Sequence, residues 1–520
     1  APNYVLITRD EPDDPYFPLQ WNLHNTVQVV EKDDDPGLVD ADIDAPEAWD
    51  IHRGNGRAIV AIGDSGIDLD HQDLIDRIWV NPGEVPGNGL DDDNNGFVDD
   101  VNGWNFCASY PCDPVNNNND TDDDDFGSHG THVAGIAGAT GNNVTGVSGV
   151  NWGTTLMPVK VVDQFGRGTV QAVADGIDYA ANNGADVINL SVAGSATAPC
   201  DLFETIRDAM VRALEKGTLV VFSAGNYGWN KVACPAALEE AIAVGSSTNV
   251  DQRAITSNYG AELDVVAPGQ SIYSAGRDNS YLYKSGTSMA APHVAGLIGL
   301  LRSCSPALSA AAARAVMEST ADDLGAPGRD DVYGFGRINA YQALVKLAQL
   351  QPITEPVRLM VADNLSSSLP VTHRVEMVTT DPTVISWTAV ITPAVSWLSL
   401  GTAGQTSVSG TGVPLSVTLV TTRPTPAVTG SYSATLLFSA ETQSGLALCP
   451  EAMEIQLNYL SSARLNYLPL IQRNDLSGPD LVVDALVATS TGVTVTVRNQ
   501  GDKAVTDAFW VCLLYTSDAA

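Results

Sequence analysis

The sequence has few basic residues and contains no long apolar run. Lys and Arg together number 26 against 62 Asp and Glu, so the formal net charge is −36. A surface of that charge repels nucleic acids and anionic membranes, and neither is expected as a partner. No stretch of about 18 apolar residues is present, so no transmembrane helix is predicted.

Cysteine is also scarce, with 7 in 520 residues. Cys107 and Cys112 lie in one Pro- and Asn-rich loop, while Cys200 and Cys234 lie next to prolines in expected loops. These are two candidate disulfides, although spacing alone leaves the pairing open. No partner is evident for the remaining cysteines, Cys304, Cys449 and Cys512. No Cys/His spacing suits zinc, so oxygen ligands are expected for any metal.

Strand-like and helix-like segments alternate from about residue 44 to 350. Continuous apolar runs predict strands buried on both faces at 58–63, 156–162, 186–190, 218–222 and 241–244. Ala-rich, helix-like segments lie between or after them, at 169–183, 202–216 and 289–302. This alternation predicts an α/β fold in three layers, a parallel sheet flanked by helices.

A different texture follows the α/β region. Residues 353–460 are rich in Thr, Val, Ser and Pro with short alternating runs such as 415–420, which predict an antiparallel β-sandwich. A linker is expected at 461–478. Residues 479–520 begin a second β domain that is too short to close, so a truncated immunoglobulin-like domain with a non-native end is expected.

Three segments of the α/β region carry residues suited to nucleophilic catalysis. Asp64 ends an apolar strand at the carboxyl edge of the predicted sheet, where sites form in parallel α/β folds. His129, in Gly-Ser-His-Gly-Thr-His, enters a helix of small residues. Ser288, in Ser-Gly-Thr-Ser-Met-Ala, stands at the start of a helix whose N–H groups and dipole favour negative charge. A serine hydroxyl needs a base and the base needs an orienting acid, and the segments supply one of each.

Each of the three residues also has an ordinary structural interpretation when it is taken alone. Asp64 could serve as a turn residue, His129 as a buried or surface histidine, and Ser288 as a helix cap. A lipase-like nucleophile elbow would require Gly two residues after the serine, where Ala290 stands. The three segments together favour a Ser–His–Asp catalytic triad.

The chain order Asp, His, Ser and the three motifs resemble the subtilisin-like serine proteases, the subtilases, from about residue 12 to 350. The resemblance implies an endopeptidase that forms an acyl-enzyme, with His129 as the base and with His132 and His293 as packing residues. It also implies that Asn226, in Ser-Ala-Gly-Asn, donates to the oxyanion. A calcium-dependent adhesive module without catalysis, and an esterase or peptide ligase, are the alternatives.

The resemblance also indicates where an extended peptide substrate would lie. Two segments would form the walls of its site, made of Ser191, Val192, Ala193 and Gly194 on one side and Ser223, Ala224 and Gly225 on the other. The first would pair with substrate as an added strand. Ala193 stands where the family usually has Gly, which would narrow the pocket, and Tyr227 near its mouth favours apolar side chains.

One calcium site follows from the resemblance to the family's calcium loop. Its ligands would be main-chain oxygens and side chains, namely those of Gly141, Asn143, Thr145, Val147 and Asp73, with Asp14 or Gln20 completing the set. Oxygen ligands of this kind suit a structural Ca²⁺.

An insertion between Asp64 and His129 offers a second candidate. Asp91, Asp93 and Asn95 alternate like the start of an EF-hand loop, and Asp99 follows, but Asn102 stands where the bidentate Glu is expected. The alternative is a solvated acidic loop. The Asp/Asn-rich run at 116–125 allows the same two interpretations.

Residues 1–12 resemble the end of a subtilase inhibitory propeptide, which leaves 13–350 as the catalytic domain. Maturation would then cut near residues 8–13, and the chain's own propeptide would be a partner beside peptide substrates. A monomer in an extracellular bacterial setting is expected, with or without attachment to the cell surface. The C-terminal β domains would act as spacers or stabilisers, with ligand binding as the alternative.

Overall fold

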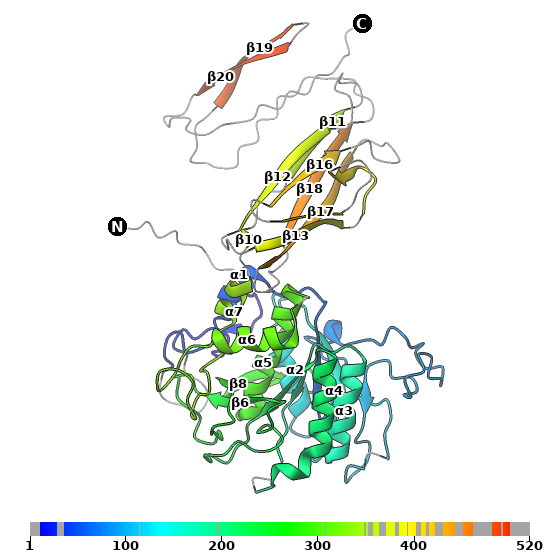
Figure 1. Cartoon of the computed structure of the whole chain (residues 1–520), viewed down its shortest axis with the longest axis vertical. Coiled ribbons are helices and arrows are strands. Elements are labelled where there is room, and N and C mark those ends of the chain that lie inside the picture. The colour runs from blue at the N-terminus through cyan, green and yellow to red at the C-terminus, as the bar shows by residue number, and fades with distance from the viewer. Residues whose placement is uncertain are drawn as a thin grey trace.

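The α/β part of the computed structural model (Figure 1) is built around a seven-stranded parallel sheet, whose strand order is β2-β3-β1-β4-β5-β6-β7. The strands are β1 Ile59–Asp64, β2 Trp104–Asn105, β3 Thr155–Lys160, β4 Val187–Leu190, β5 Leu219–Ser223, β6 Ile242–Ser247 and β7 Val265–Pro268. Every neighbouring pair in this sheet runs parallel. The α/β part predicted from the alternation of segments is therefore confirmed.

The structure describes most of the chain up to residue 347, and separate strand segments after it. The described ranges are 11–28, 36–113, 115–194, 197–306, 308–347, 350–351, 357–362, 371–379, 384–392, 394–401, 407–411, 415–421, 430–442, 451–460, 481–489 and 492–499. The expected propeptide end at 1–12 lies outside this part except for its last two residues. The expected linker at 461–478 and the tail after 499 lie outside it entirely.

Helices cover both faces of the sheet. Alternate residues of β1 explain why: Val60 and Ile62 belong to the core under α2 (His129–Gly138) and α5 (Thr287–Cys304), whereas Ala61 faces the opposite core. That second core lies under α3 (Val170–Asn182) and α4 (Glu204–Glu215), which pack side by side. Strands buried on both faces need continuous apolar sequence.

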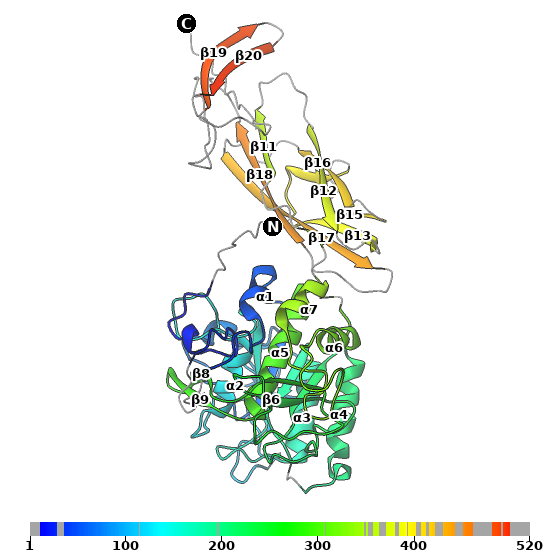
Figure 2. The same ribbon diagram turned by 90° about the vertical axis from the view of Figure 1, so that its left-hand side faces the viewer.

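Smaller elements surround these layers. They are α1 Ala45–Ile51, α6 Ala310–Ser319, α7 Ala340–Leu347, the short helices η1 Phe17–Leu19, η2 Ile75–Arg77 and η3 Cys200–Phe203, and the hairpin β8 Ile272–Gly276 and β9 Ser280–Lys284. The hairpin packs on α2 (Figure 2). No helix of the described residues is long and apolar enough to cross a membrane.

Both candidate disulfides form. Cys107 is bonded to Cys112 and Cys200 to Cys234. Cys304, at the end of α5, is disulfide-bonded as well, although no partner for it was evident in the sequence.

Two further sheets follow the α/β region. The strands are β10 Leu350–Gln351, β11 Val357–Ala362, β12 Val371–Thr379, β13 Val384–Thr392, β14 Leu398–Leu400, β15 Ser407–Gly410, β16 Leu415–Thr421, β17 Gly430–Thr442 and β18 Glu451–Leu460. They form sheets in the orders β10-β12-β16-β14 and β11-β18-β17-β13-β15. One core holds residues of both sheets, including Trp387, Leu400 and Leu436. The β region is thus found, but the prediction of a purely antiparallel arrangement is wrong, because β11 pairs parallel with β18.

A last antiparallel pair consists of β19 Leu481–Thr489 and β20 Gly492–Asn499. The expectation of an immunoglobulin-like domain here, and the boundaries of the predicted domains, stay predictions.

Candidate active site

The carboxyl ends of three neighbouring parallel strands bring the predicted site together. Asp64 is the last residue of β1, while Ser191 follows β4 and Ala224 follows β5. The strands β1, β4 and β5 are adjacent in the sheet, so the segments that leave them meet at one edge. In open α/β folds this edge is where ligands bind.

Asp64 and His129 form a direct hydrogen bond. The Asp64 carboxylate is fully buried, and its Oδ1 accepts from His129 Nδ1 at 2.7 Å and from the Ser65 N–H at 2.8 Å. Because a carboxylate only accepts, the proton on this bond belongs to His129 Nδ1, and Nε2 of the neutral ring carries the free electron pair. The ring is thus oriented with its basic nitrogen away from Asp64.

Two opposing effects set the pKa of His129. Burial lowers it, but the charge and hydrogen bond of the Asp64 carboxylate raise it, and the net pKa lies above the usual value. The charge of Lys284 acts in the lowering direction. A pKa raised by its acid partner keeps the imidazole a usable proton acceptor near neutral pH.

Ser288 is the second residue of α5, and its side chain is half-buried. Its Oγ donates to Ser191 O at 3.1 Å, while Ser191 Oγ donates to Ser288 O at 2.8 Å, so the start of α5 is fastened to the segment after β4. The hydroxyl therefore rests on that segment here. Hydrogen bonds between a nucleophile and its base often tighten only when substrate is bound.

Asn226 lies across from the start of α5. Its Oδ1 accepts from the Thr287 N–H at 2.8 Å and from Thr287 Oγ1 at 3.1 Å, which fixes the orientation of the amide and leaves Nδ2 as its donor end. The Met289 N–H donates to Gly286 O. Of the first three N–H groups of α5, that of Ser288 is the one without an acceptor in the described part of the chain.

A hollow of about 340 Å³ opens beside Asp64, His129 and Ser191. It is lined by Asp64, Ser65, Asp125, His129, Val162, Phe165, Gly166, Ser191, Val192, Ala193 and Lys284. An adjoining hollow of about 120 Å³ shares Val192 and Ala193 and has a mostly apolar wall that includes Val173, Phe203 and Ile206. The predicted wall residues of the first segment lie here, and Ser223 joins them through a 3.3 Å bond from its Oγ to Val192 O.

The two other histidines of the motifs are buried packing residues, as predicted. His132 Nε2 lies 3.1 Å from both Ile272 O and Leu282 O, and burial lowers its pKa to about 3. His293 bonds Met289 O through Nδ1, and burial lowers its pKa to about 4. Neither ring reaches the hollow that His129 lines.

The predicted calcium loop and its distant partners come together. Asp73 Oδ2 accepts from the Val147 N–H and its Oδ1 from Asn143 Nδ2, at 2.9 and 3.3 Å. Asp14 Oδ1 accepts from the Asn143 N–H, and Gln20 exchanges two hydrogen bonds with the Ser148 backbone. Both carboxylates are buried, and burial raises the pKa of Asp73. Two buried carboxylates beside a loop with carbonyl-type ligands are the donor chemistry that a hard cation prefers.

In the acidic insertion the Asn95 N–H donates to Asp91 Oδ1 and to Asp93 Oδ1, both at 3.0 Å, so three of the four predicted ligands lie together. Asp91 accepts from the N–H groups of Asn95 and Gly96, and Asp99 accepts from those of Asn88 and Gly89. These two carboxylates thus stabilise turns of their own loop. Asp93 also lies with two residues that the predicted set leaves out, Glu84 and Asp100.

Residues of the acidic run at 116–125 form hydrogen bonds with the start of α2, next to His129. Asp123 is buried and accepts from Ser65 Oγ and from the N–H and Oγ1 of Thr131 on α2, and Asp125 Oδ2 accepts from the His129 N–H. Asp125 and Asp123 lie only four and eight residues before their partners His129 and Thr131, and only the Ser65 contact joins distant parts of the chain, so no spacing motif marks this set.

Comparisons with known proteins agree with the geometry. Residues 55–336 match the model of the subtilase family. The chain is 39% identical over 303 residues to "Thermitase" of Thermoactinomyces vulgaris, covering 58% of this chain and 93% of thermitase. It is 36% identical over 345 residues to "Thermophilic serine proteinase" of Bacillus sp. (strain AK1), covering 66% of this chain and 71% of that protein.

Among solved structures, a protease of Pseudoalteromonas arctica PAMC 21717 matches with a TM-score of 0.50 and 28% identity over 64% of this chain and 99% of that chain. These relatives are named as proteases, which sets aside the non-catalytic adhesive module. The chain is a serine endopeptidase and belongs to the subtilase family.

Proposed function

We propose that Ser288, His129, Asp64 and Asn226 carry out peptide-bond hydrolysis through an acyl-enzyme. The observation that carries the proposal is the 2.7 Å bond between His129 Nδ1 and Asp64 Oδ1, in a hollow whose wall residue Ser191 accepts a hydrogen bond from Ser288 Oγ at the start of a helix. In the first step Ser288 Oγ attacks the carbonyl carbon and its proton passes to His129 Nε2. The Asn226 Nδ2 and the Ser288 N–H donate to the oxyanion as it forms.

The later steps use the same groups. His129 gives its proton to the leaving amine as the C–N bond breaks, which leaves an acyl ester on Ser288. Water then attacks the ester, its proton passes to His129, and His129 returns a proton to Ser288 Oγ as the acid leaves. Asp64 keeps the imidazole in the required tautomer throughout and stabilises its charged form.

The substrate class proposed is an extended peptide with apolar side chains before the scissile bond. Residues 191–194 would pair with the peptide backbone as an added strand. The support comes from the hollow next to them, whose wall contains Val173, Phe203 and Ile206. No acidic side chain lines that hollow among the described residues, so it offers no counter-charge to a basic side chain.

Structural calcium at the Asn143 loop belongs to the proposal. Asp14, Asp73 and Asn143, with backbone oxygens of Gly141, Thr145 and Val147, would hold it. A bound Ca²⁺ supplies positive charge among buried carboxylates, and it would join the segment around Asp14 to the loop. Bacterial secretion, synthesis as a zymogen with residues 1–12 at the end of the propeptide, and immunoglobulin-like spacers after residue 353 complete the proposal.

The test is active-site labelling of the full chain, expressed with a complete prosegment. A fluorophosphonate should label Ser288, as located by mass spectrometry, and Ser288→Ala should abolish the label. Labelling with Ca²⁺ that fades after chelation supports the calcium part as well. Label on a different residue, or none on folded protein, would refute the assigned nucleophile.

A further inference from the structure

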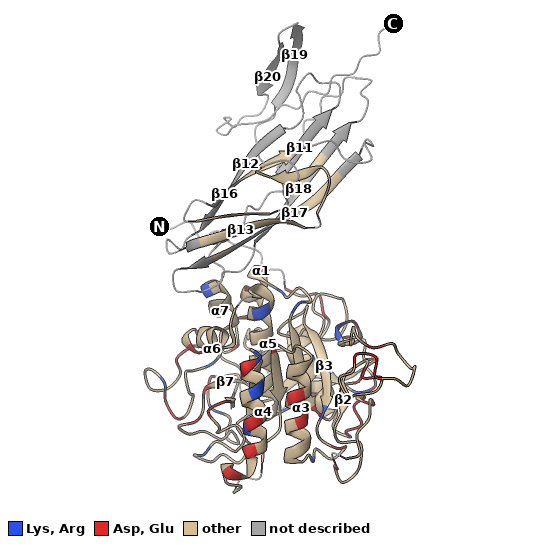
Figure 3. Cartoon of the chain, turned by 45° about the vertical axis from the view of Figure 1, so that its right-hand side comes forward, with Lys and Arg blue, Asp and Glu red and all other residues tan. Residues whose placement is uncertain are grey.

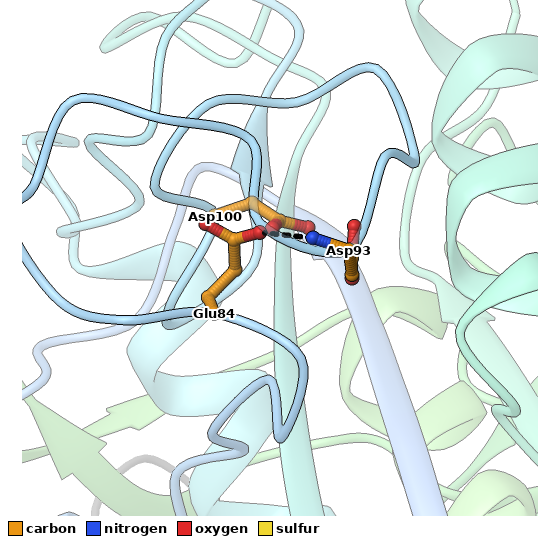
Figure 4. A group of neighbouring side chains, drawn as sticks. All are labelled: Glu84, Asp93 and Asp100. Carbon is orange, nitrogen blue, oxygen red and sulfur yellow. Dashed lines mark hydrogen bonds between the residues drawn. The ribbon is translucent and has the colours of Figure 1, made fainter.

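Three carboxylates of the acidic insertion form a group apart from the catalytic centre. One oxygen each of Glu84, Asp93 and Asp100 lies within 4.8 Å of the other two (Figure 4). Glu84 is 8% exposed and Asp100 is 0% exposed, while Asp93 reaches the surface. The acidic loops beside β2 and β3 hold this group (Figure 3).

Glu84 supplies the observation that points to a ligand. Its Oε1 accepts from the N–H groups of Asp92 and Asp93 at 2.9 and 3.2 Å. Its Oε2 is buried and has no hydrogen-bond partner in the described part of the chain. The carboxylate points toward that of Asp100 in Figure 4. A buried charged oxygen without a partner is costly, and a bound ion removes that cost.

The surroundings compensate the group with neutral donors. Asn81 Nδ2 donates to Asp93 Oδ2 and Asp100 Oδ1, both at 2.9 Å, and the Tyr179 hydroxyl donates to Asp100 Oδ2 at 2.6 Å. None of the ion pairs between described residues includes these three carboxylates. Negative charges this close repel one another, and a bound cation removes that repulsion.

We propose that Glu84, Asp93 and Asp100 bind a calcium ion. All donors are oxygens, which excludes the softer metals that prefer His or Cys. The three oxygens lie within 4.8 Å of one another, close enough for one Ca²⁺ ion to sit about 2.4 Å from each of them. This site is separate from the Asn143 loop and does not depend on the peptidase mechanism.

The ion would fasten the insertion to the α/β core. Tyr179 lies on α3 and is buried, so the bond from its hydroxyl to Asp100 connects the site to that helix. The insertion is also linked to the segment before His129, because Thr121 Oγ1 donates to Asn102 O and Asn119 Nδ2 to Asp99 O. Calcium here would hold a long acidic loop against unfolding and against cleavage by other copies of the enzyme.

The test measures calcium binding to the full chain in a Ser288→Ala background. This substitution prevents self-digestion and makes the readout independent of activity. The protein is stripped with a chelator, and the number of bound Ca²⁺ ions is measured by calorimetry or equilibrium dialysis. Tb³⁺ luminescence, excited through aromatic side chains such as Tyr179, gives a second readout. Glu84→Gln and Asp100→Asn should each remove one ion or weaken one site about 10-fold or more.

Asp91→Asn is the matched control, since this residue lies in the same loop but only bonds backbone N–H groups. It should keep the full number of ions, and Asp73→Asn should remove a different one. Asp93→Asn, at an exposed position, provides a variant that folds even if Glu84→Gln does not. Unchanged stoichiometry and affinity in Glu84→Gln or Asp93→Asn would overturn the proposal, as would loss of the ion in Asp91→Asn with retention in Glu84→Gln.

Discussion

The catalytic centre and the acidic insertion hold their carboxylates in opposite ways. Asp64 is a single buried acid at the end of a sheet strand, and its carboxylate accepts a hydrogen bond from the His129 imidazole. In the insertion several acids crowd together, and backbone N–H groups and Asn81 hold them. The first arrangement is fixed by the core and raises the pKa of His129, whereas the second places several acids close together with neutral donors as their partners.

This difference indicates which regions should depend on a bound ion for their stability. The Asp64–His129 pair should work without a metal next to it, because its geometry comes from β1 and α2. The insertion and the Asn143 loop, by contrast, consist of irregular backbone with buried acids such as Asp73 and Asp100. Changes in the first region should therefore alter kinetics, and changes in the other two should alter stability.

The largest effect is expected for Asp64→Asn. Loss of the carboxylate removes the acceptor that fixes the His129 tautomer, and kcat should fall on the order of 10⁴-fold with little loss of stability. His129 acts as a base only when deprotonated, so in the parent kcat/KM should rise with pH through a value above 6.5, the ordinary pKa of histidine. In the variant this limb should move to lower pH, since the raising effect is gone. If the pH profile of the variant matched that of the parent, Asp64 would not be the cause of the raised pKa of His129.

A smaller kinetic effect is expected for Asn226→Ala. Removing one oxyanion donor should lower kcat by about 10²–10³-fold while KM changes little. Asn226→Asp is the companion variant, because it keeps an oxygen for the Thr287 N–H but loses the donor. Steady-state kinetics on one peptide substrate measure both. If the Asp variant retained parental kcat, Asn226 would be a structural anchor of α5 and not an oxyanion donor.

A stability effect without a kinetic one is expected for Asp73→Asn. At free Ca²⁺ about 100 times its Kd, a lost site costs about 2.7 kcal/mol, or roughly 5–10 °C in Tm. Thermal unfolding in the Ser288→Ala background, with Ca²⁺ and with a chelator, checks this. The chelator should lower the parent's Tm more than the variant's. Equal sensitivity of both proteins to the chelator would place the stabilising ion elsewhere.

The proposed catalytic residues could be placed on the fold from the sequence, whereas the residues of the insertion could be placed only in part. Asp64, His129 and Ser288 lie at ends of regular elements, where apolar runs and small-residue helices reveal their place. Glu84 and Asp100 meet through irregular backbone, and the Tyr179 partner of Asp100 is 79 residues away, so no local pattern marks them.

The EF-hand spacing in the insertion did not point to Glu84 or Asp100. It pointed to Asp91 and Asp99, but a carboxylate near glycines can equally cap the N–H groups of its own turns, as these two do. The direction of β11 was missed for a related reason. Alternation of apolar residues tells which face of a strand is buried, but it does not tell which strand is its neighbour or in which direction it runs.

The smallest effect on kinetics is expected where the catalytic hollow adjoins the acidic insertion. Phe165 lines the hollow at His129 and is half-exposed, and its ring lies 4.8 Å from that of Tyr110 and 5.9 Å from that of Phe126. These rings offer apolar area to a substrate side chain, worth about 1–2 kcal/mol when covered. Phe165→Ala should therefore lower kcat/KM roughly 10-fold for peptides with apolar residues before the scissile bond, and much less for their alanine counterparts.

Val115→Ala is the control for that prediction, since Val115 is 84% exposed and does not line the hollow. A set of quenched fluorescent peptides that differ at one position at a time identifies which substrate side chain meets Phe165. Equal losses on apolar and alanine peptides would mean that Phe165 shapes the loop near His129 and does not contact the substrate. The substrate site would then not extend beyond His129 to these rings, and the rings of Tyr110, Phe126 and Phe165 would only pack against one another.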